Sequence, residues 1–473
     1  MEKERQAIRI LIAPNVANPY DQRMVSELAA GFNGIGHYAA PLAAPASPLE
    51  LRQLCESFSI DVVLQINRTR DPELPLPPDI RHIAWYQDVF PETLHGFAEG
   101  FKSSDILYVL GDAQVLGLNE DLPCLVGSLF TGVDPTTLAF KSVGHPARLD
   151  FSLCGGLPHP AGGAGLLADT LWHLDQLIRR KPLLGKSQTV RLLRKLLFGS
   201  LLPVDFVPYS TLLAMRDIVR SFYRPLRGEL DIHLIAMALR QLVEREGEMF
   251  EDIPSTSSPE QSNWLATLMK SQTGRYRGKS HLAARLVRFL AGESAFFQPS
   301  LKEAITGAIG YFAQSYPRIL DREALVKLAS AVSPSLAIYG PGMNLHDFAA
   351  PYFKGVIDTQ RELLDVYSRS RINLSNNTHG LGLHSRTLEC MATGNFLFMH
   401  ESPHDNKPGG MLTSFEPEVH FGSYTPESFA EKSARWLRDE KERMQVGIRA
   451  QTIIRERHCW HHRAQQIIDD LKR

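Results

Sequence analysis

The residues best suited to chemistry lie together near residue 385. Arg386 and Glu389 stand three positions apart, which places both on one face of a helix. Gly380 and Gly382 precede that helix and predict a loop whose backbone can approach a ligand closely. The free N–H groups at a helix start and the forked guanidinium group both bind anions. The spacing therefore predicts a binding site for a diphosphate, with a carboxylate one turn further on that can accept two ribose hydroxyls.

A structural role explains the same residues in another way. Arg386 and Glu389 could form an ion pair on the helix surface, and the two glycines could make a plain turn. The surrounding pattern favours the anion site. A strand is predicted at 371–375, a loop follows it, and a helix is predicted from Ser385 to Thr393. Ligands of open parallel sheets bind beyond the carboxyl ends of the strands.

Alternating strands and helices must position this site. Near the N-terminus the predicted helices are 21–34 and 48–58, and the predicted strands are 8–13, 61–67, 82–86 and 105–110. The alternation restarts with a strand near 149–156 and returns after residue 325. There the predicted helices are 325–329 and 360–369, and the predicted strands are 336–340, 353–357, 371–375 and 395–399. Strands that are apolar on both faces indicate parallel sheets covered by helices. The predicted fold class is α/β, with two doubly wound, Rossmann-like lobes and a helical insertion in the C-terminal lobe.

Length and composition limit the possible classes. A chain of 473 residues exceeds what one hydrophobic core usually organises, so two domains are expected. The 51 basic and 52 acidic residues give a formal charge of -1, which argues against nucleic acid as a partner. Five scattered cysteines predict reduced thiols. The charged N-terminus and the lack of a run of about 18 apolar residues predict a cytoplasmic protein without a membrane span.

Two segments, 366–375 and 382–394, resemble the donor-domain core of GT-B glycosyltransferases. The resemblance is closest to the CgeB-like, or spore-maturation-type, group, whose pattern is Arg, two residues, Glu, and then Ala-x-Gly. Residues 457–464 are similar to the closing segment of that group. The first 160 residues agree more loosely, and residues 180–315 lie outside the resemblance.

The residue pattern and the resemblance together predict four segments. They are an acceptor-side N-terminal domain (1–145), a donor domain (146–180 with 316–457), a helical insertion (181–315), and a C-terminal helix (458–473) that packs back on the N-terminal domain.

The resemblance also implies an activity, the metal-independent transfer of a sugar from a nucleotide-diphosphate sugar to an acceptor. A UDP-sugar is the expected donor, no cofactor is expected, and a retaining hexosyltransferase is the expected type. Arg386 and the helix start would stabilise the charge on the departing diphosphate, and Glu389 would hold the ribose. The base would lie against Tyr339, Gly340 and Val356. The other predicted donor-binding residues are Asn376, Gly380, Gly382, His384 and Ser385.

The catalytic groups are less constrained. Many retaining relatives carry a second glutamate eight positions earlier, where this chain has Leu381. His379 or His384 could take over that contact with the sugar, although a single loop histidine is commonly a structural hydrogen-bonding group. Asp88 is the candidate for activating or binding the acceptor. As an alternative it caps a helix, because Pro91 follows closely.

Further acceptor-side candidates are Asn15, Asn18 and Asn67, and turn formation explains asparagines in such loops equally well. The segment 458–462 is rich in histidine but has no recognised ligand spacing, so no metal site is predicted. The acceptor, which can be a protein, a glycan or a metabolite, stays open. Two rival functions also remain: a nucleotide-sugar epimerase or hydrolase of the same fold, and a non-catalytic sugar-nucleotide-binding scaffold.

Overall fold

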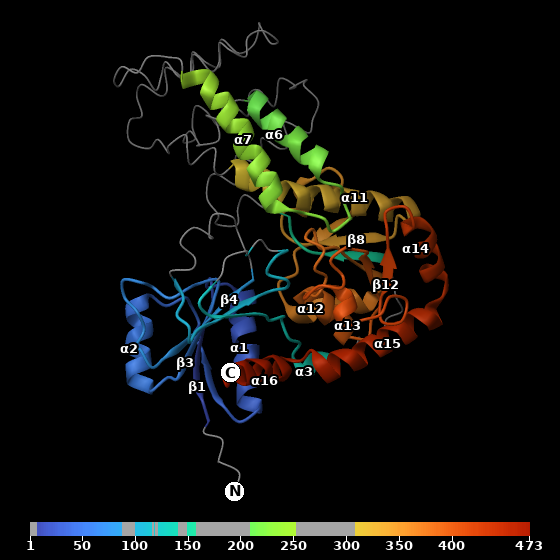
Figure 1. Ribbon diagram of the computed structural model, residues 1–473. Helices are drawn as coiled ribbons and strands as arrows, with labels where there is room; N and C mark the ends of the chain where they lie inside the picture. The colour runs from blue at the N-terminus through green and yellow to red at the C-terminus, as the bar shows by residue number, and fades with distance from the viewer. Residues whose placement is uncertain are drawn as a thin grey trace.

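A computed structural model describes residues 7–87, 100–115, 118, 122–140, 149–157, 209–251 and 308–473 of the chain. It has two lobes, each built on a parallel sheet of six strands with helices packed on it (Figure 1). The predicted α/β fold with two doubly wound lobes is therefore confirmed.

The N-terminal lobe has the strand order β2-β1-β3-β4-β5-β6. Neither edge strand, β2 or β6, is among the predicted strands, because their residues are largely exposed and lack the continuous apolar run of the inner strands. The elements of this lobe are β1 (Arg9–Ala13), α1 (Pro19–Gly34), β2 (Tyr38–Pro41), α2 (Pro48–Phe58), β3 (Val62–Ile66), β4 (Arg81–Tyr86), β5 (Ile106–Val109), β6 (Leu125–Ser128) and α3 (Pro135–Leu138).

The C-terminal lobe has the strand order β12-β11-β10-β7-β8-β9, also parallel throughout. Its strands are β7 (Leu149–Cys154), β8 (Leu336–Tyr339), β9 (Phe353–Gly355), β10 (Ser370–Ser375), β11 (Leu397–His400) and β12 (Gly422–Tyr424). Its helices are α11 (Tyr316–Val332), α12 (Gln360–Arg369), α13 (Ser385–Ala392), α14 (Phe429–Arg438) and α15 (Glu440–Arg457).

Helices occupy the described part of the chain between the neighbouring strands β7 and β8. These are α6 (Tyr209–Phe222), α7 (Ile232–Glu251) and a π-helix (Tyr311–Ser315) that runs into α11. In Figure 1, α6 and α7 stand above α11, on the far side of the C-terminal lobe from the N-terminal lobe. Buried side chains of all four helices belong to the same hydrophobic core as β7 and β8, so this block is packed on the C-terminal lobe.

The last helix, α16 (Trp460–Asp470), returns to the N-terminal lobe and lies beside α1 (Figure 1). Its first residue, Trp460, packs edge to face on Trp85 of β4 with ring centroids 6.3 Å apart. The indole Nε1 of Trp460 also donates a hydrogen bond to Glu27 Oε2 at 2.6 Å. The end of the chain thereby ties the two lobes together.

Helix α1 begins where local signals place it. The Asn18 side chain accepts the Asp21 N–H at 2.7 Å, and Pro19 takes the first helical position. Met24, Val25, Leu28 and Phe32 on one side of the helix are buried in the lobe. This start fixes the first two turns, which carry Tyr20 and Arg23, against the C-terminal lobe.

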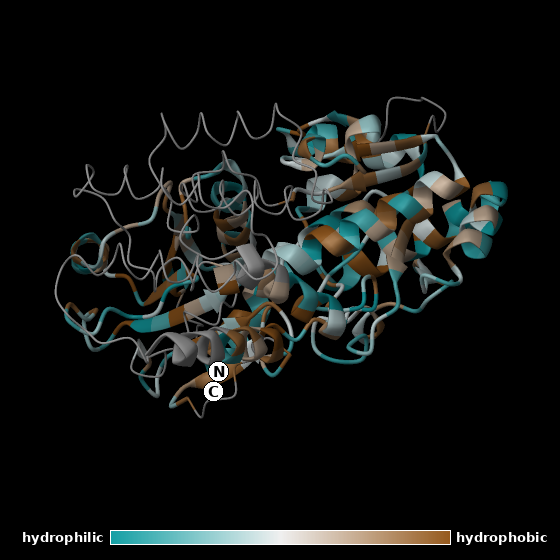
Figure 2. Ribbon diagram, turned by 90° about the horizontal axis from the view of Figure 1, so that it is seen from above, coloured by the Kyte–Doolittle hydropathy of each residue, from teal (hydrophilic) through white to brown (hydrophobic). Residues whose placement is uncertain are grey.

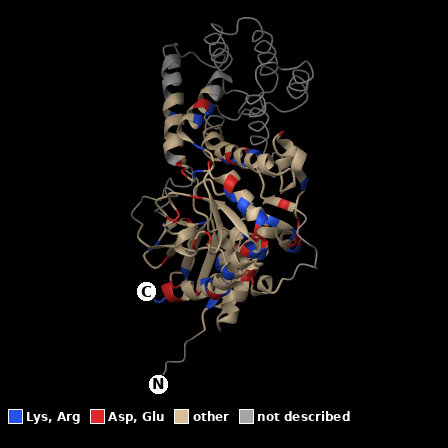
Figure 3. Cartoon of the chain, turned by 90° about the vertical axis from the view of Figure 1, so that its right-hand side faces the viewer, with Lys and Arg blue, Asp and Glu red and all other residues tan. Residues whose placement is uncertain are grey.

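The surface is that of a globular protein. Hydrophobic and hydrophilic residues alternate along the outer helices in Figure 2, and charges of both signs are interspersed on the faces seen in Figure 3. None of the described helices is both long and apolar enough to cross a membrane. All five cysteines are free thiols, as predicted.

Candidate functional site

A cavity with a volume of about 210 Å³ lies between the two lobes. The N-terminal lobe contributes Gln87 and Leu110, which follow β4 and β5. The C-terminal lobe contributes residues from the end of β7, from the start of α11 and from the loop and helix after β10. They are Gly156, Gln314, Arg318, Arg322, Asn376, Asn377, Thr378, His379, Leu381, Leu383, His384 and Arg386. The cavity therefore lies beyond the carboxyl ends of strands from both sheets, where open parallel sheets bind ligands.

Three arginines supply the charge of this cavity. Arg318 and Arg322 lie one turn apart on α11, and Arg386 lies in the first turn of α13. A Cβ atom on Gly155 would lie 2.7 Å from Arg322 Nη2 and 3.5 Å from Arg386 Cζ, so these two guanidinium groups approach the same point. Arg322 Nη1 is buried and has no hydrogen-bond partner among the described residues. Burial, followed by the charge of Arg386, lowers the pKa of Arg322 to about 10.

No acidic residue is among the described residues that line the cavity. The carboxylate of Asp321, next to Arg322 in the chain, is fully buried. It accepts hydrogen bonds from the Tyr223 hydroxyl (2.6 Å), the Leu226 N–H (2.8 Å) and the Asn376 amide (3.2 Å). Neighbouring guanidinium groups repel one another in a low-dielectric site unless an anion lies between them. The cavity is therefore suited to a polyanion, and a diphosphate matches several forked cations.

His384 adds an uncharged hydrogen-bond donor. It caps α13, and its Nδ1 accepts the Arg386 N–H at 3.4 Å. Ser385 Oγ lies 3.1 Å from the same Nδ1 and accepts a hydrogen bond from the Tyr20 hydroxyl of the other lobe at 3.1 Å. Because a backbone N–H can only donate, Nδ1 is the acceptor, and the neutral ring carries its proton on Nε2. Burial and the nearby arginines lower the pKa of His384 to about 3, so the ring stays neutral at pH 7.

This cap occupies one of the N–H groups that are predicted to be free at the helix start. The Arg386 N–H is occupied by the His384 side chain, although both residues line the cavity. Guanidinium groups, rather than this backbone N–H, therefore supply the positive charge. The helix start still faces the space between the lobes, as the anion-site prediction requires.

Glu389 has a partner that the local sequence does not suggest. Its Oε1 lies 2.7 Å from Arg23 Nη1 of α1, across the lobe boundary, and accepts a weaker hydrogen bond from Gln360 at 3.4 Å. The alternative of an ion pair between Arg386 and Glu389 is wrong within the described residues, because Arg386 turns to the cavity instead. Both contacts of Glu389 go to Oε1, so Oε2 has no hydrogen-bond partner in the described part of the chain.

Three predicted donor-binding glycines are packed closely against other segments of the chain. A Cβ atom on Gly340 would lie 2.5 Å from the Gly155 carbonyl oxygen, and one on Gly382 would lie 2.5 Å from a methionine side chain. One on Gly380 would collide with the Gly228 carbonyl. None of the three lines the cavity. The missing side chains permit close packing between segments of this lobe, and the donor-binding role of the three glycines stays a prediction.

Asn376 and His379 lie at the cavity, as the prediction of donor-binding and catalytic residues requires. The Asn376 amide nitrogen is held by Asp321, and its buried Oδ1 accepts no hydrogen bond from the described residues. The His379 N–H donates to Asn377 Oδ1 at 2.9 Å, which fixes the loop at this position. Asn376 Oδ1 is thus a candidate acceptor for a ligand hydroxyl, while the side chain of His379 stays the candidate for contact with the sugar.

Other predicted donor-binding residues lie outside the cavity lining. Tyr339 ends β8 and is half-buried, while Val356 follows β9 and is 51% exposed. Ser385 makes the contact with Tyr20 described above. That Tyr339 and Val356 line the binding site of the nucleotide base stays a prediction.

The acceptor-side candidates have structural roles in the N-terminal lobe. Asn18 caps α1, and Asn67 turns the chain with a φ of 53° while accepting the Gln87 N–H at 2.7 Å. Asn15 is half-buried in the loop after β1. Turn and cap formation thus explains Asn18 and Asn67. Asp88 lies outside the described residues, directly after the cavity residue Gln87.

Three residues of the cavity are not predicted from the sequence: Arg318, Arg322 and Gln87. The two arginines have i,i+4 spacing, which would have placed them on one helix face had the helix been predicted from residue 316. Only 325–329 was predicted as helix there, because the buried side of α11 includes the charged residues Asp321 and Arg322 and so lacks a clean apolar stripe. Gln87 directly follows the correctly predicted strand β4. Its position at the carboxyl end of a parallel strand is the signal that could have identified it as a site residue.

Cys459, His461 and His462 have ligand atoms within 4.8 Å of one another at the start of α16. Two of the three are already used by the helix start. His462 Nδ1 accepts the Cys459 N–H at 3.1 Å, and Cys459 Sγ lies 3.7 Å from the Ile454 carbonyl oxygen. The group is therefore explained as a helix cap, and the absence of a metal site stays a prediction.

Glu27 makes the lobe boundary sensitive to pH. Burial, partly offset by Arg23 and the Trp460 hydrogen bond, raises its pKa from an ordinary 4.5 to about 7. Between these values the folded state holds a proton that the unfolded state has lost, so the free energy of unfolding falls as pH rises through this window. At about 1.4 kcal/mol per pKa unit, the loss is on the order of 3 kcal/mol at most.

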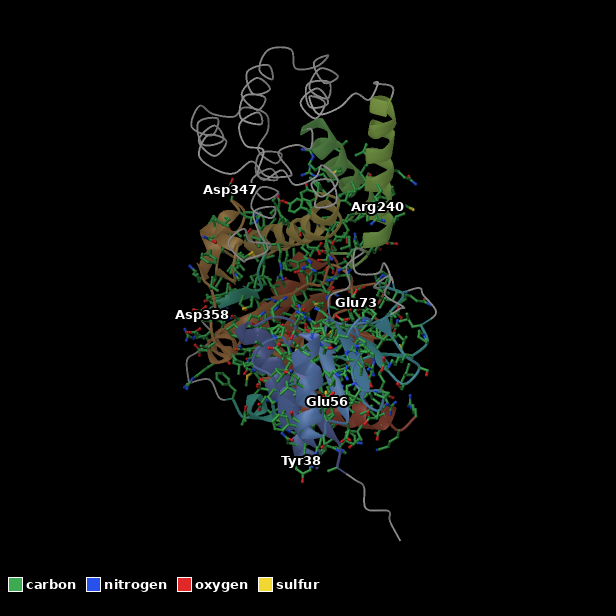
Figure 4. The ribbon with its side chains drawn as sticks, turned by 90° about the vertical axis from the view of Figure 1, so that its left-hand side faces the viewer. Tyr38, Glu56, Glu73, Arg240, Asp347 and Asp358 are labelled. Atoms are coloured by element: carbon green, nitrogen blue, oxygen red, sulfur yellow. The ribbon has the colours of Figure 1, made fainter. Side chains whose placement is uncertain are left out.

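We expect Glu27→Gln to flatten this dependence, because glutamine keeps the acceptor for Trp460 without titrating. The measurement is the melting temperature of both proteins at pH 5 and pH 8. Glu56→Gln is the control, since Glu56 is exposed on α2 and is labelled on the N-terminal lobe in Figure 4. Equal pH slopes for the wild type and Glu27→Gln would contradict the assignment.

Comparison with known proteins supports a broad class. Residues 321–469 match the family model described as glycosyl transferase-like. Among curated proteins, none matches the chain significantly. Solved structures that are similar include a glycosyltransferase from Rickettsia africae ESF-5, with 8% identity, 99% of this chain and 98% of that chain covered, and a TM-score of 0.44.

Two further solved structures are similar at the same level. Anabaena Alr3699/HepE in complex with UDP-glucose has 10% identity, covers 98% of this chain and 99% of its own, and has a TM-score of 0.45. Sucrose-phosphate synthase from Thermosynechococcus elongatus has 10% identity, 98% of each chain covered and a TM-score of 0.45. The matched family segment contains Arg322, Arg386 and Glu389, and it supports the prediction of a glycosyltransferase at the level of the superfamily.

Proposed function

We propose that the chain is a glycosyltransferase that transfers a hexosyl group from a nucleotide-diphosphate sugar to an acceptor. The observation that carries the proposal is the cavity between the lobes, where Arg318, Arg322 and Arg386 meet and no described lining residue is acidic. A UDP-sugar is the donor that we expect, and retention is the expected stereochemistry. The CgeB-like group and a cytoplasmic location are part of the same proposal, carried by the sequence pattern and the free thiols.

The proposed reaction needs stabilisation of negative charge on the leaving group. When the bond between the sugar and the diphosphate breaks, charge grows on the departing phosphate oxygens. The guanidinium groups of Arg322 and Arg386 already converge at the end of β7, so they can pair with that charge without first moving together. The neutral His384 ring can donate a further hydrogen bond from Nε2. His379 is the group that we assign to contact with the sugar, and Asp88 the group for the acceptor.

Fixed cations of this kind take the part that a divalent metal plays in other transferases. We therefore expect transferase activity to persist in excess EDTA. The measurement is the initial rate with and without the chelator, and restoration by Mg²⁺ or Mn²⁺ of a rate lost in EDTA would contradict metal independence.

The function is tested with a panel of nucleotide sugars. Thermal shift identifies the donor, and mass spectrometry then follows the products with and without a cell extract as the source of acceptor. Transfer of a sugar mass to an acceptor supports the proposal. Epimerised or hydrolysed donor in the absence of any acceptor would assign the chain to the rival enzyme class, and binding without any turnover would indicate a scaffold.

A further inference from the structure

Arg23 is an N-terminal-lobe residue that reaches into the predicted donor site. It lies in the second turn of α1, and its Nη1 is 2.7 Å from Glu389 Oε1 on α13. The Glu389 side chain is only 5% exposed, while that of Arg23 is 27% exposed. Ion pairs between solvated surface residues contribute little, but this carboxylate is largely removed from water. The pair therefore matters for the position of the Glu389 carboxylate.

Arg23 is the cation that compensates Glu389 in the described structure. The other polar contact of Glu389 is the uncharged Gln360 amide at 3.4 Å. Arg386, one turn earlier on the same helix, lines the cavity beside Arg322. The Arg23 contact is the shorter of the two polar contacts of Glu389, so it fixes where the carboxylate lies. Without Arg23, Glu389 would be held less firmly and would be a poorer acceptor for hydroxyl groups.

Arg23 is itself held in position from several sides. Its Nη1 lies 3.8 Å from Glu27, one turn later on α1, and Glu27 is anchored by the Trp460 indole at 2.6 Å. Its guanidinium group lies 5.8 Å from the centre of the Tyr20 ring. The Tyr20 hydroxyl in turn bonds Ser385 at the start of α13. The first turns of α1 and α13 thus form one polar contact across the lobes.

We propose that Arg23 is a positioning residue of the donor site, which fixes the Glu389 carboxylate through Oε1 and leaves Oε2 for the ribose hydroxyls. The ribose contact is then complete only when the N-terminal lobe is closed on the C-terminal lobe. This inference rests on the proposed function, because it requires a nucleotide as the ligand. It adds that the lobe opposite the donor domain contributes to recognition of the ribose.

The test separates the ribose from the diphosphate by the choice of probe. UDP has both groups, 2′-deoxy-UDP lacks one ribose hydroxyl, and inorganic pyrophosphate has no ribose. Calorimetric titration of the full chain is carried out with each probe for the wild type, Arg23→Gln and Arg23→Lys. We expect Arg23→Gln to weaken UDP about tenfold or more, as for loss of one partner of a buried charge pair. Pyrophosphate binding should change by less than about twofold, and Arg23→Lys should restore part of the UDP affinity.

The deoxy probe provides the sharper comparison. If Arg23 positions Glu389 for the ribose, then the loss of affinity caused by Arg23→Gln is smaller for 2′-deoxy-UDP than for UDP. The reason is that 2′-deoxy-UDP already lacks one of the affected hydrogen bonds. Arg52→Gln is the matched control, since Arg52 pairs with Glu56 on the exposed surface of α2. It should bind all three probes as the wild type does.

Each contrary result has a distinct meaning. An equal loss for UDP and pyrophosphate would show that Arg23 acts only on lobe closure, and unchanged binding of UDP would show that it does not act at all. Either result overturns the inference while the proposed function stands. A wild-type chain that binds neither UDP, other nucleotides nor pyrophosphate would instead refute the proposed function, and this inference with it.

Discussion

Arg322→Ala and Arg386→Ala are each expected to weaken binding of the donor by about a hundredfold, since hydrogen bonds between forked guanidinium groups and phosphates are among the strongest in proteins. Their guanidinium groups converge beside Gly155, so the loss of either removes a cation from the same phosphate position. Turnover should fall at least as far, because charge on the diphosphate increases in the transition state. The measurements are titration with the donor found in the panel and the initial rate of transfer.

The stability of the same variants gives a second, independent readout. In the absence of ligand, the proximity of the buried Arg322 and the half-buried Arg386 opposes folding, as the lowered pKa of Arg322 indicates. We therefore expect both variants to unfold at the same temperature as the wild type or at a higher one, while the stabilisation by the donor disappears. Arg369→Ala is the control, because Arg369 pairs with Asp365 on the surface of α12. Undiminished donor binding in both cavity variants would show that the site is wrongly placed.

Asp321→Ala is expected to cause the largest loss of stability, roughly 3–5 kcal/mol, because it leaves several buried donors without their acceptor. The Asp321 carboxylate is fully buried and receives hydrogen bonds from Tyr223 and Leu226 of the helical block and from Asn376 of the cavity loop. It joins α6 to the donor site, so its loss should also weaken donor binding by releasing Asn376. Scanning calorimetry and amide exchange of residues 376–384 provide the measurements.

Tyr223→Phe is the matched variant for this prediction. It removes one hydroxyl donor and leaves the Leu226 and Asn376 bonds in place, so a loss of about 1 kcal/mol is expected. Donor binding should follow the same order, with a smaller loss of affinity for Tyr223→Phe than for Asp321→Ala. If Asp321→Ala melts like the wild type, then the helical block is not coupled to the cavity loop through this carboxylate.

Local sequence determined most of the elements near the site. Helix α12 runs from Gln360 to Arg369, as predicted, because Thr359 and Glu362 form a capping box at its start. Helix α13 begins at Ser385, as predicted, after a strand and a polar loop. The inner strands could be predicted because burial on both faces requires continuous apolar residues. The edge strands β2 and β6 could not, since one side of each has no strand to pair with and their side chains are largely exposed.

The sequence by itself determined two parallel α/β lobes, and it placed Arg386, His384 and Asn376 where the second sheet opens. Only the tertiary structure decided their partners. Arg322 joins Arg386 because α11 packs next to the end of β7, and Glu389 pairs with Arg23, which is 366 positions away in the chain. The physical reason is that helices and strands follow from neighbouring residues, whereas the partner of a buried charge is whichever opposite group the packed lobes bring within about 4 Å, where Coulomb attraction and hydrogen bonding become strong.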